Sequence, residues 1–146
     1  MVSGCVYDEF LQYVYTHPEL TVEGLNQAYA RIADSYGMEL YSESSRYNWM
    51  YISHNFESPF YYISYAVSAM ASLQLWAVAE RDRDEAIALY NKMISLGGYD
   101  RGYCELLETL GLRVFTQDLD ACVRDAYDEL ESLCFQYEEG ALASAA

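Results

Sequence analysis

Residues 59–79 read PFYYISYAVSAMASLQLWAVA and contain no charged side chain, although Glu57 and Glu80 flank them closely. A run of this length could span a bilayer, but tyrosine, serine and glutamine interrupt it, and no basic flank sets an orientation. Pro59 suits the first turn of a helix, where its missing N–H group would have no partner in any case. The stretch therefore predicts a long, mostly buried central helix of a helical protein rather than a membrane span.

Glycine and proline divide the rest of the chain into further helical blocks. Pro18 ends the first block because a proline ring cannot continue a helix, Thr21 is the expected N-cap of the second, and Gly37 is its expected stop. Besides the central helix, we expect helices over residues 4–17, 21–37, 84–96, 102–110 and 118–137, with Gly97 and Gly98 ending the helix at 84–96 and Asp100 capping the next. Residues 38–58 read as a loop in which 45–52 could form a short helix.

Apolar residues recur at steps of three and four in these blocks, as one buried helix face requires. The expected inward residues are Val6, Phe10, Val14, His17, Val22, Leu25, Tyr29, Ile32, Tyr36, Ile87, Tyr90, Met93, Ile94, Leu119, Cys122, Val123, Ala126, Tyr127, Leu130 and Leu133. No strand alternation and no internal repeat stands out. We therefore predict an all-α fold of five to six helices in a single bundle-like unit over residues 1–140, followed by a disordered tail at 141–146.

The charge balance limits the partners of the chain. Its 146 residues carry a net charge of -15, which repels phosphate backbones and anionic lipid surfaces. We expect no nucleic acid and no membrane partner. Four cysteines, at positions 5, 104, 122 and 134, are widely spaced and form no C-x-x-C pair. They predict buried free thiols in a reducing compartment, and the absence of a visible signal peptide makes the cytoplasm the expected location.

Aromatic side chains and one of the two histidines gather in residues 49–65. Tyr61 and Tyr62 each lie about one helical turn before Tyr65, so phenols would emerge from one face near the start of the central helix. The preceding loop could fold His54 over that face. Imidazole and phenol donors suit the oxyanion that forms when water attacks a peptide carbonyl. The alternative is an aromatic helix start that only packs in a core.

The usual catalytic motifs H-E-x-x-H, G-x-S-x-G and the P-loop do not occur in this sequence. His17 and His54 are its only histidines, so they cannot supply a multi-histidine metal site. We expect no metal ligands and no cofactor in this chain.

The run His54-Asn55-Phe56-Glu57-Ser58-Pro59-Phe60-Tyr61-Tyr62-Ile63-Ser64-Tyr65-Ala66 resembles a signature of the thimet oligopeptidase and oligoendopeptidase F family of zinc peptidases. Further stretches match the family in order, from Asp8-Glu9-Phe10 and Tyr36-Gly37 to Leu96-Gly97-Gly98 and Leu110-Gly111-Leu112. The resemblance covers most of the chain and implies the C-terminal portion of the catalytic domain.

The resemblance implies specific roles. His54 and Tyr65 would donate hydrogen bonds to the oxyanion, while Tyr61 and Tyr62 would bind the substrate. Tyr61 matches the oligoendopeptidase F branch and Tyr62 matches the spacing of the thimet branch. In the family, zinc and the catalytic glutamate come from upstream residues that this sequence does not contain, so the chain is expected to be inactive alone.

Three functions stay open at this point. The chain could be part of a zinc oligopeptidase that acts on short peptides, with a separate upstream catalytic half as its partner. It could be a stand-alone helical peptide-binding module without catalysis, or an unrelated interaction protein whose aromatic cluster is only core. Under the first hypothesis the central helix would lose packing partners, so we also expect a homo-oligomer.

Overall fold

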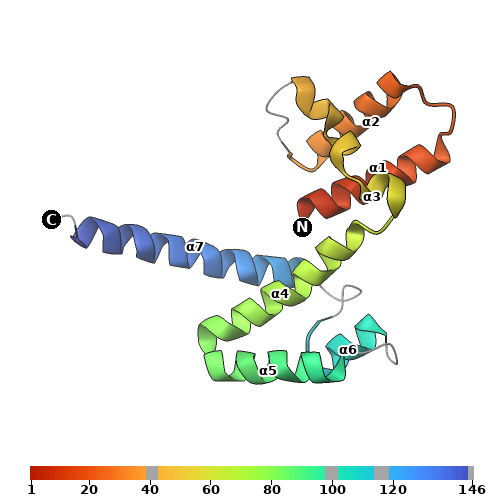
Figure 1. Cartoon of the computed structure of the whole chain (residues 1–146). Coiled ribbons are helices and arrows are strands. Elements are labelled where there is room, and N and C mark those ends of the chain that lie inside the picture. The colour runs from red at the N-terminus through yellow and green to blue at the C-terminus, as the bar shows by residue number, and fades with distance from the viewer. Residues whose placement is uncertain (39–42, 98–101, 114–118, 145–146) are drawn as a thin grey trace. The chain divides into compact units, whose positions relative to one another are not determined.

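The computed structural model describes residues 1–38, 43–97, 102–113 and 119–144, with side chains at 119, 120, 122 and 138–144 left aside. Every secondary-structure element in these ranges is a helix, which confirms the all-α fold. The described ranges hold eight helices, more than the five to six expected (Figure 1). The excess arises because residues 43–57, expected to be loop apart from one short helix, contain both a 3₁₀ helix η1 (Glu43–Tyr51) and a single-turn helix α3 (His54–Glu57).

Contacts along the chain divide it into two compact units, Met1–Ser68 and Ala69–Ala146, where the sequence predicts one. The first unit holds α1 (Val2–Thr16), α2 (Val22–Ser35), η1, α3 and the first turns of α4 (Ile63–Arg81). The second holds the rest of α4 together with α5 (Arg83–Leu96), α6 (Tyr103–Thr109) and α7 (Leu119–Ser144). Helix α4 therefore contributes residues to both units.

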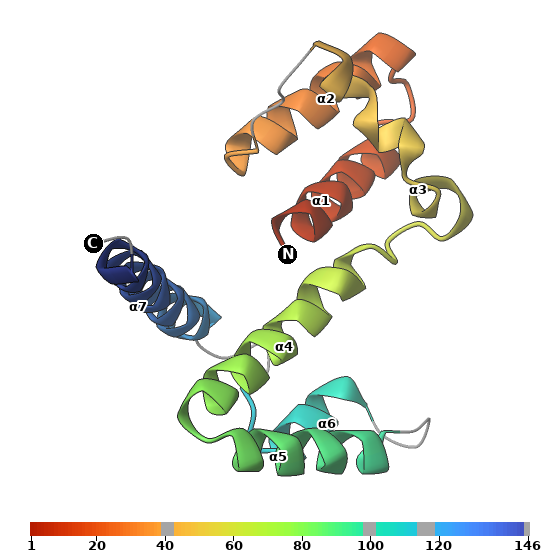
Figure 2. The same ribbon diagram turned by 60° about the vertical axis from the view of Figure 1, so that its left-hand side comes forward.

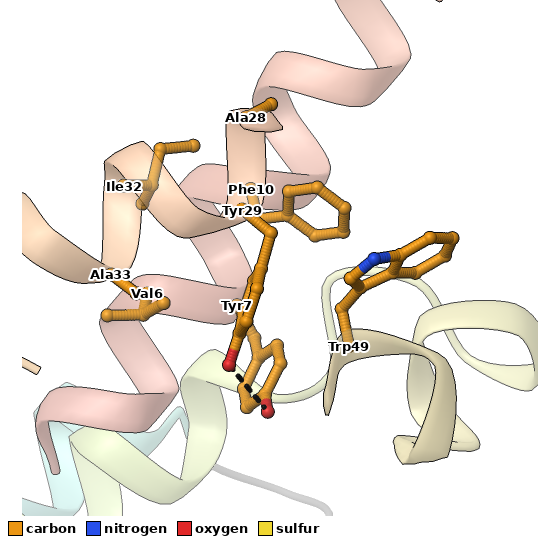
Figure 3. Packing of buried hydrophobic residues seen from close by; sticks show 8 residues of the cluster. All are labelled: Val6, Tyr7, Phe10, Ala28, Tyr29, Ile32, Ala33 and Trp49. Carbon is orange, nitrogen blue, oxygen red and sulfur yellow. Dashed lines mark hydrogen bonds between the residues drawn. The ribbon is translucent and has the colours of Figure 1, made fainter. Parts of the chain in front are cut away.

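The core of the first unit is largely aromatic (Figure 3). It comprises Val6, Tyr7 and Phe10 of α1, Ala28, Tyr29, Ile32 and Ala33 of α2, and Trp49 of η1. The expected inward positions of α1 and α2 are thus confirmed at their centres. They are wrong at the ends of α2, where Val22 is 65% exposed and Tyr36 is 40% exposed.

The boundaries of α2 follow from its capping residues. The hydroxyl of Thr21 accepts a hydrogen bond from the backbone N–H of Gly24 at 3.2 Å, as an N-cap side chain does. Gly37 has a φ of 69°, in the left-handed region that glycine enters easily, and so ends the helix. Both residues have the roles that the sequence predicts for them.

In the second unit, helices α5 and α6 lie side by side in both views (Figure 2). Ala71, Leu107, Leu110 and Leu112 form the buried cluster, with Leu89, Met93 and Leu96 packed against it. Asp82 caps α5 by accepting a hydrogen bond from the backbone N–H of Glu85 at 2.9 Å. The expected stop at Gly97 is observed, whereas Gly98 and Asp100 lie outside the described residues.

The expected inward face of α5 is largely wrong. Ile87, Tyr90 and Ile94 are exposed at 50%, 53% and 59% respectively. The helix has a second apolar face, formed by Ala86, Leu89, Met93 and Leu96, and it is the last three of these that pack against the core cluster. Similarly, Ala126 of α7 is buried as expected, but Tyr127 and Leu130 on its stripe are exposed, while the side chains of Leu119 and Cys122 lie outside the described set.

The central helix differs from its prediction in two ways. It begins at Ile63 rather than at Pro59, because Phe60 has a φ of 65° and directs the chain through a turn before the helix starts. It is half-buried rather than mostly buried: Ala66, Met70 and Ala71 are the buried residues, and the apolar residues from Leu73 to Ala79 are only partly covered. No helix in the described part of the chain is both long and apolar enough to cross a bilayer.

Two further expectations concern the end of the chain and the cysteines. Helix α7 continues to Ser144 and so includes residues 141–144, which the sequence predicts as tail. Cys5, Cys104 and Cys134 are free thiols as expected, but none is fully buried, and Cys134 is exposed because it lies on the open face of α7. The side chain of Cys122 is not among those described.

Candidate substrate-binding site

His54 is placed by the tight succession of η1 and α3. The backbone N–H of Asn55 donates to the carbonyl of Ile52 at 3.0 Å, and that of Ser58 donates to the carbonyl of His54 at 3.1 Å. These bonds close the single turn of α3 immediately after η1. His54 is thus the first residue of a short helix whose approach is anchored by the buried Trp49.

The three tyrosines are placed by the turn that precedes α4. Phe60 adopts a left-handed backbone conformation, which costs a non-glycine residue of order 1–3 kcal/mol. The N–H of Tyr61 then donates to the carbonyl of Ser58 at 3.1 Å, and the N–H of Tyr65 donates to that of Tyr62 at 3.2 Å. This strained turn brings the phenols of residues 61–65 back towards α3.

The imidazole and the phenol singled out from the sequence lie together in the structure. Tyr65 Oη and His54 Nε2 are 3.5 Å apart. Their rings meet edge to face, with centroids 5.8 Å apart and planes at 88°. Tyr61 stacks on the imidazole at 5.2 Å with planes only 9° apart, so it fixes the ring from one side.

Tyr62 connects this cluster to the core of the first unit. Its ring contacts that of Tyr65 at 5.0 Å and that of Tyr7 at 5.0 Å, both edge to face. Tyr7 in turn shares a hydrogen bond with Tyr29, with 3.2 Å between the two phenol oxygens (Figure 3). Burial, followed by this hydrogen bond, raises the pKa of the Tyr7 phenol, so both the proton and the bond persist at neutral and mildly alkaline pH.

A cavity of about 300 Å³ opens beside His54 and Tyr65. Its lining consists of Tyr51, Ile52, Ser53, His54, Tyr62 and Tyr65, all within the first unit. Of Tyr61 and Tyr62, Tyr62 lines this cavity, whereas Tyr61 is not part of the lining and packs its ring on the imidazole and against the ring of Tyr65. Tyr51, Ile52 and Ser53 were missed, and their position directly before His54 is the signal that could have indicated them.

The chemistry of the cavity is that of hydrogen-bond donors. One imidazole, the phenols and a serine hydroxyl can donate to a ligand oxygen, and the walls are otherwise aromatic and apolar. No group of three histidine, cysteine, aspartate or glutamate side chains suited to a metal occurs among the described residues. The described residues that line the cavity therefore do not fit a zinc site.

Two solved structures are similar to the chain. An oligoendopeptidase F matches it with a TM-score of 0.77 and 26% identity, and PZ peptidase A with an inhibitor matches it with a TM-score of 0.79 and 26% identity. Each match covers 90% of this chain but only 24% of the other, so the chain spans about a quarter of their length.

No family model matches the chain, and no curated protein does. The three-dimensional similarity is therefore the finding that tests the resemblance seen at residues 54–66. Both matched structures are peptidases by name, and both share the helical arrangement over nearly the whole chain. The resemblance of this chain to the oligoendopeptidase F family of peptidases is thereby confirmed.

Proposed function

We propose that this chain is the C-terminal part of the catalytic domain of a zinc-dependent oligopeptidase and supplies the side chains that orient a short peptide and stabilise its oxyanion. The observation that carries the proposal is the pairing of His54 Nε2 and Tyr65 Oη at 3.5 Å in one cavity. Similarity to two peptidase structures supports it. The zinc and the catalytic carboxylate belong to a part of such an enzyme that this sequence does not contain, so the chain is inactive alone.

The geometry of the pair suits a single oxygen acceptor. Two donors 3.5 Å apart can both lie 2.7–3.1 Å from one oxygen, which is the range that oxyanion donors require. Tyr65 would donate its phenol proton and His54 its Nε2–H. Both groups would act without giving up the proton, because they stabilise negative charge on the carbonyl oxygen rather than carry out proton transfer.

The aromatic residues around the pair would bind and orient the peptide. Tyr62 lines the cavity and holds Tyr65 from the side of the core, while Tyr61 holds the imidazole. Orientation matters because a misplacement of about 1 Å can cost on the order of 10²-fold in rate. We assign Tyr61 to positioning His54 and Tyr62 to the wall that contacts substrate.

A second function has one specific observation in its favour. The cavity is built entirely from residues 51–65 of the first unit, so its walls do not depend on any other part of an enzyme. A stand-alone module that binds peptides without cleaving them would need no more than this. Under that alternative, the isolated chain binds short peptides by itself, and Tyr65→Phe weakens the binding.

A chimera tests the first function directly. In it, this chain replaces the matching quarter of an oligoendopeptidase F, and zinc-dependent cleavage of an internally quenched short peptide is measured. We expect cleavage, reduced about 10²-fold or more by Tyr65→Phe and changed less than about twofold by Tyr15→Phe. Tyr15 is a matched control because it is an exposed tyrosine of the first unit outside the cavity.

A folded, zinc-loaded chimera without cleavage would contradict the peptidase function. Measurable peptide affinity of the isolated chain, observed together with that result, would favour the binding module instead.

A further inference from the structure

A chain of buried hydrogen bonds leads from helix α2 to the residue next to His54. The indole N–H of Trp49 donates to Asn26 Oδ1 at 3.0 Å, and Asn55 Nδ2 donates to the backbone carbonyl of Trp49 at 2.7 Å. Asn26, Trp49 and Asn55 are 2%, 8% and 7% exposed. Asn26 and Asn55 are the buried polar residues of the described chain, and both belong to this one network.

The bond from Asn55 holds the turn between η1 and α3. The carbonyl of Trp49 also accepts from the N–H of Ile52, but at 3.4 Å, which is long for a backbone hydrogen bond. The side chain of Asn55 therefore makes the shorter contact across this turn. Because Asn55 follows His54 directly, the same contact sets where the first turn of α3 begins and hence where the imidazole is presented.

One acceptor of this network has no partner among the described residues. Within the described part of the chain, Asn55 Oδ1 is buried and accepts no hydrogen bond, and an unpaired buried acceptor is destabilising. Rotating the amide would place Oδ1 against the Trp49 carbonyl, so the present orientation is the better one. An apolar residue of similar size would avoid the unpaired oxygen, so stability alone does not explain an asparagine at this position.

We propose that Asn26, Trp49 and Asn55 are positioning residues that hold His54 in register with Tyr65. This inference rests on the proposed function, in which the imidazole and the phenol share one oxygen acceptor. The indole of Trp49 ties η1 to α2 through its hydrogen bond to Asn26, and the amide of Asn55 ties α3 to η1 through its hydrogen bond to the Trp49 carbonyl. Tyr61 then fixes only the plane of the imidazole, by stacking on it.

NMR of the histidine rings in the whole 146-residue chain tests the proposal without requiring activity. The chain has two histidines: His54 reports on the site, and His17, stacked on Tyr13 in another part of the unit, serves as internal reference. In the parent chain, we expect the three rings around His54 to shift its Cε1–H and Cδ2–H signals away from those of free histidine.

We expect Asn55→Leu to move the His54 signals most of the way to free-histidine values while the His17 signals stay in place. The melting temperature should change by less than about 4 °C, because the unpaired oxygen is lost together with the hydrogen bond. Trp49→Phe removes the other link and should move the same signals. Thr21→Ala is the control, since it removes the N-cap of α2 and lowers stability outside the network.

Two results would overturn the proposal. In the first, the His54 signals stay unchanged in folded Asn55→Leu or Trp49→Phe, and only the melting temperature falls, as a structural role predicts. In the second, both histidines move together, or Thr21→Ala moves His54 as much, which shows general loosening of the unit. The outcome is separable from the peptidase test, because these signals can respond even if the chimera does not cleave peptide.

Discussion

Helices α1 and α4 meet where Gly4 lies against Ala66. A Cβ atom placed on Gly4 would lie 3.0 Å from the Cβ of Ala66 and 3.2 Å from its backbone nitrogen. Such contacts are closer than normal packing allows, so the absence of a side chain at residue 4 lets the two helices approach. Since Tyr62 lies directly before α4 and Tyr65 lies in its first turn, this close approach also bears on where those two tyrosines lie.

Gly4→Ala should destabilise the protein, against the usual trend. Alanine normally stabilises a helix interior by about 1 kcal/mol relative to glycine. Here the new methyl group meets both the side chain and the backbone of Ala66, and we expect a net loss of about 1–3 kcal/mol. This loss in the free energy of unfolding can be measured by urea denaturation, with tryptophan fluorescence as the signal.

Gly24→Ala is the matched control for that substitution. Its nearest neighbour would be the Cδ2 atom of Leu20 at 3.0 Å, the end of a flexible side chain that can move aside. We expect Gly24→Ala to be neutral or to stabilise by up to about 1 kcal/mol. If both glycines respond to alanine in the same direction, the contact with Ala66 does not determine the spacing of α1 and α4.

Tyr7→Phe should lower the free energy of unfolding by about 1–3 kcal/mol at neutral pH, because Tyr29 loses the partner of its buried hydroxyl. The pKa of Tyr7 is raised in the folded state, chiefly by burial. A raised pKa contributes stability that is complete below the unfolded value of about 10 and is lost as the pH rises through the folded value. The difference in the free energy of unfolding between the parent and Tyr7→Phe should therefore become smaller above pH 10.

The measurement is a series of urea denaturation curves at pH 8, 10 and 11 for both proteins. Tyr15→Phe, which removes an exposed phenol from the same helix, is the control and should leave the pH dependence unchanged. A parent and a Tyr7→Phe variant whose stabilities stay separated by a constant amount up to pH 11 would show that the buried phenol does not contribute in this way.

Tyr61→Phe and Tyr65→Phe should have different effects on kcat in the peptidase chimera. Tyr65 faces His54 Nε2 with its hydroxyl, whereas Tyr61 contacts the imidazole only through its ring. Tyr65→Phe should lower kcat by about 10²-fold with little change in KM, as expected for a donor used in the transition state. Tyr61→Phe keeps the stacking ring and should retain kcat within about threefold of the parent. Equal losses from both substitutions would argue against the assigned roles.

The outer face of α5 predicts self-association. Ile87, Tyr90 and Ile94 lie about one turn apart and are at least half exposed. Ile87 and Tyr90 also line an apolar groove of about 310 Å³, together with Leu75, Trp76 and Ala86 among others. Exposed apolar surface of this kind is commonly covered by a partner. We expect sedimentation velocity to show a dimer or larger species, shifted towards monomer by Ile87→Ser with Ile94→Ser. A compact monomer at high concentration in the parent chain would contradict this.

Much of the local structure could be predicted from the sequence because its causes are local. Thr21 and Gly37 bound α2 through a side-chain cap and a left-handed backbone, and both effects act within a few residues. The central positions of α1 and α2 pack as the helical period predicts. The motif from His54 to Ala66, together with the order and spacing of the other matching stretches, indicated the peptidase resemblance that the solved structures confirm.

The remainder was decided by packing between segments. Helix α5 has two apolar faces, and the face of Leu89 and Met93 is buried rather than that of Ile87 and Ile94 because it meets the core cluster around Leu107. The start of α4 depends on the turn at Phe60, and the spacing of apolar residues in the sequence does not predict this turn. The distance between His54 and Tyr65 is likewise set by tertiary contacts. The helical period predicts which residues share a helix face, but it does not predict which other segment packs against that face.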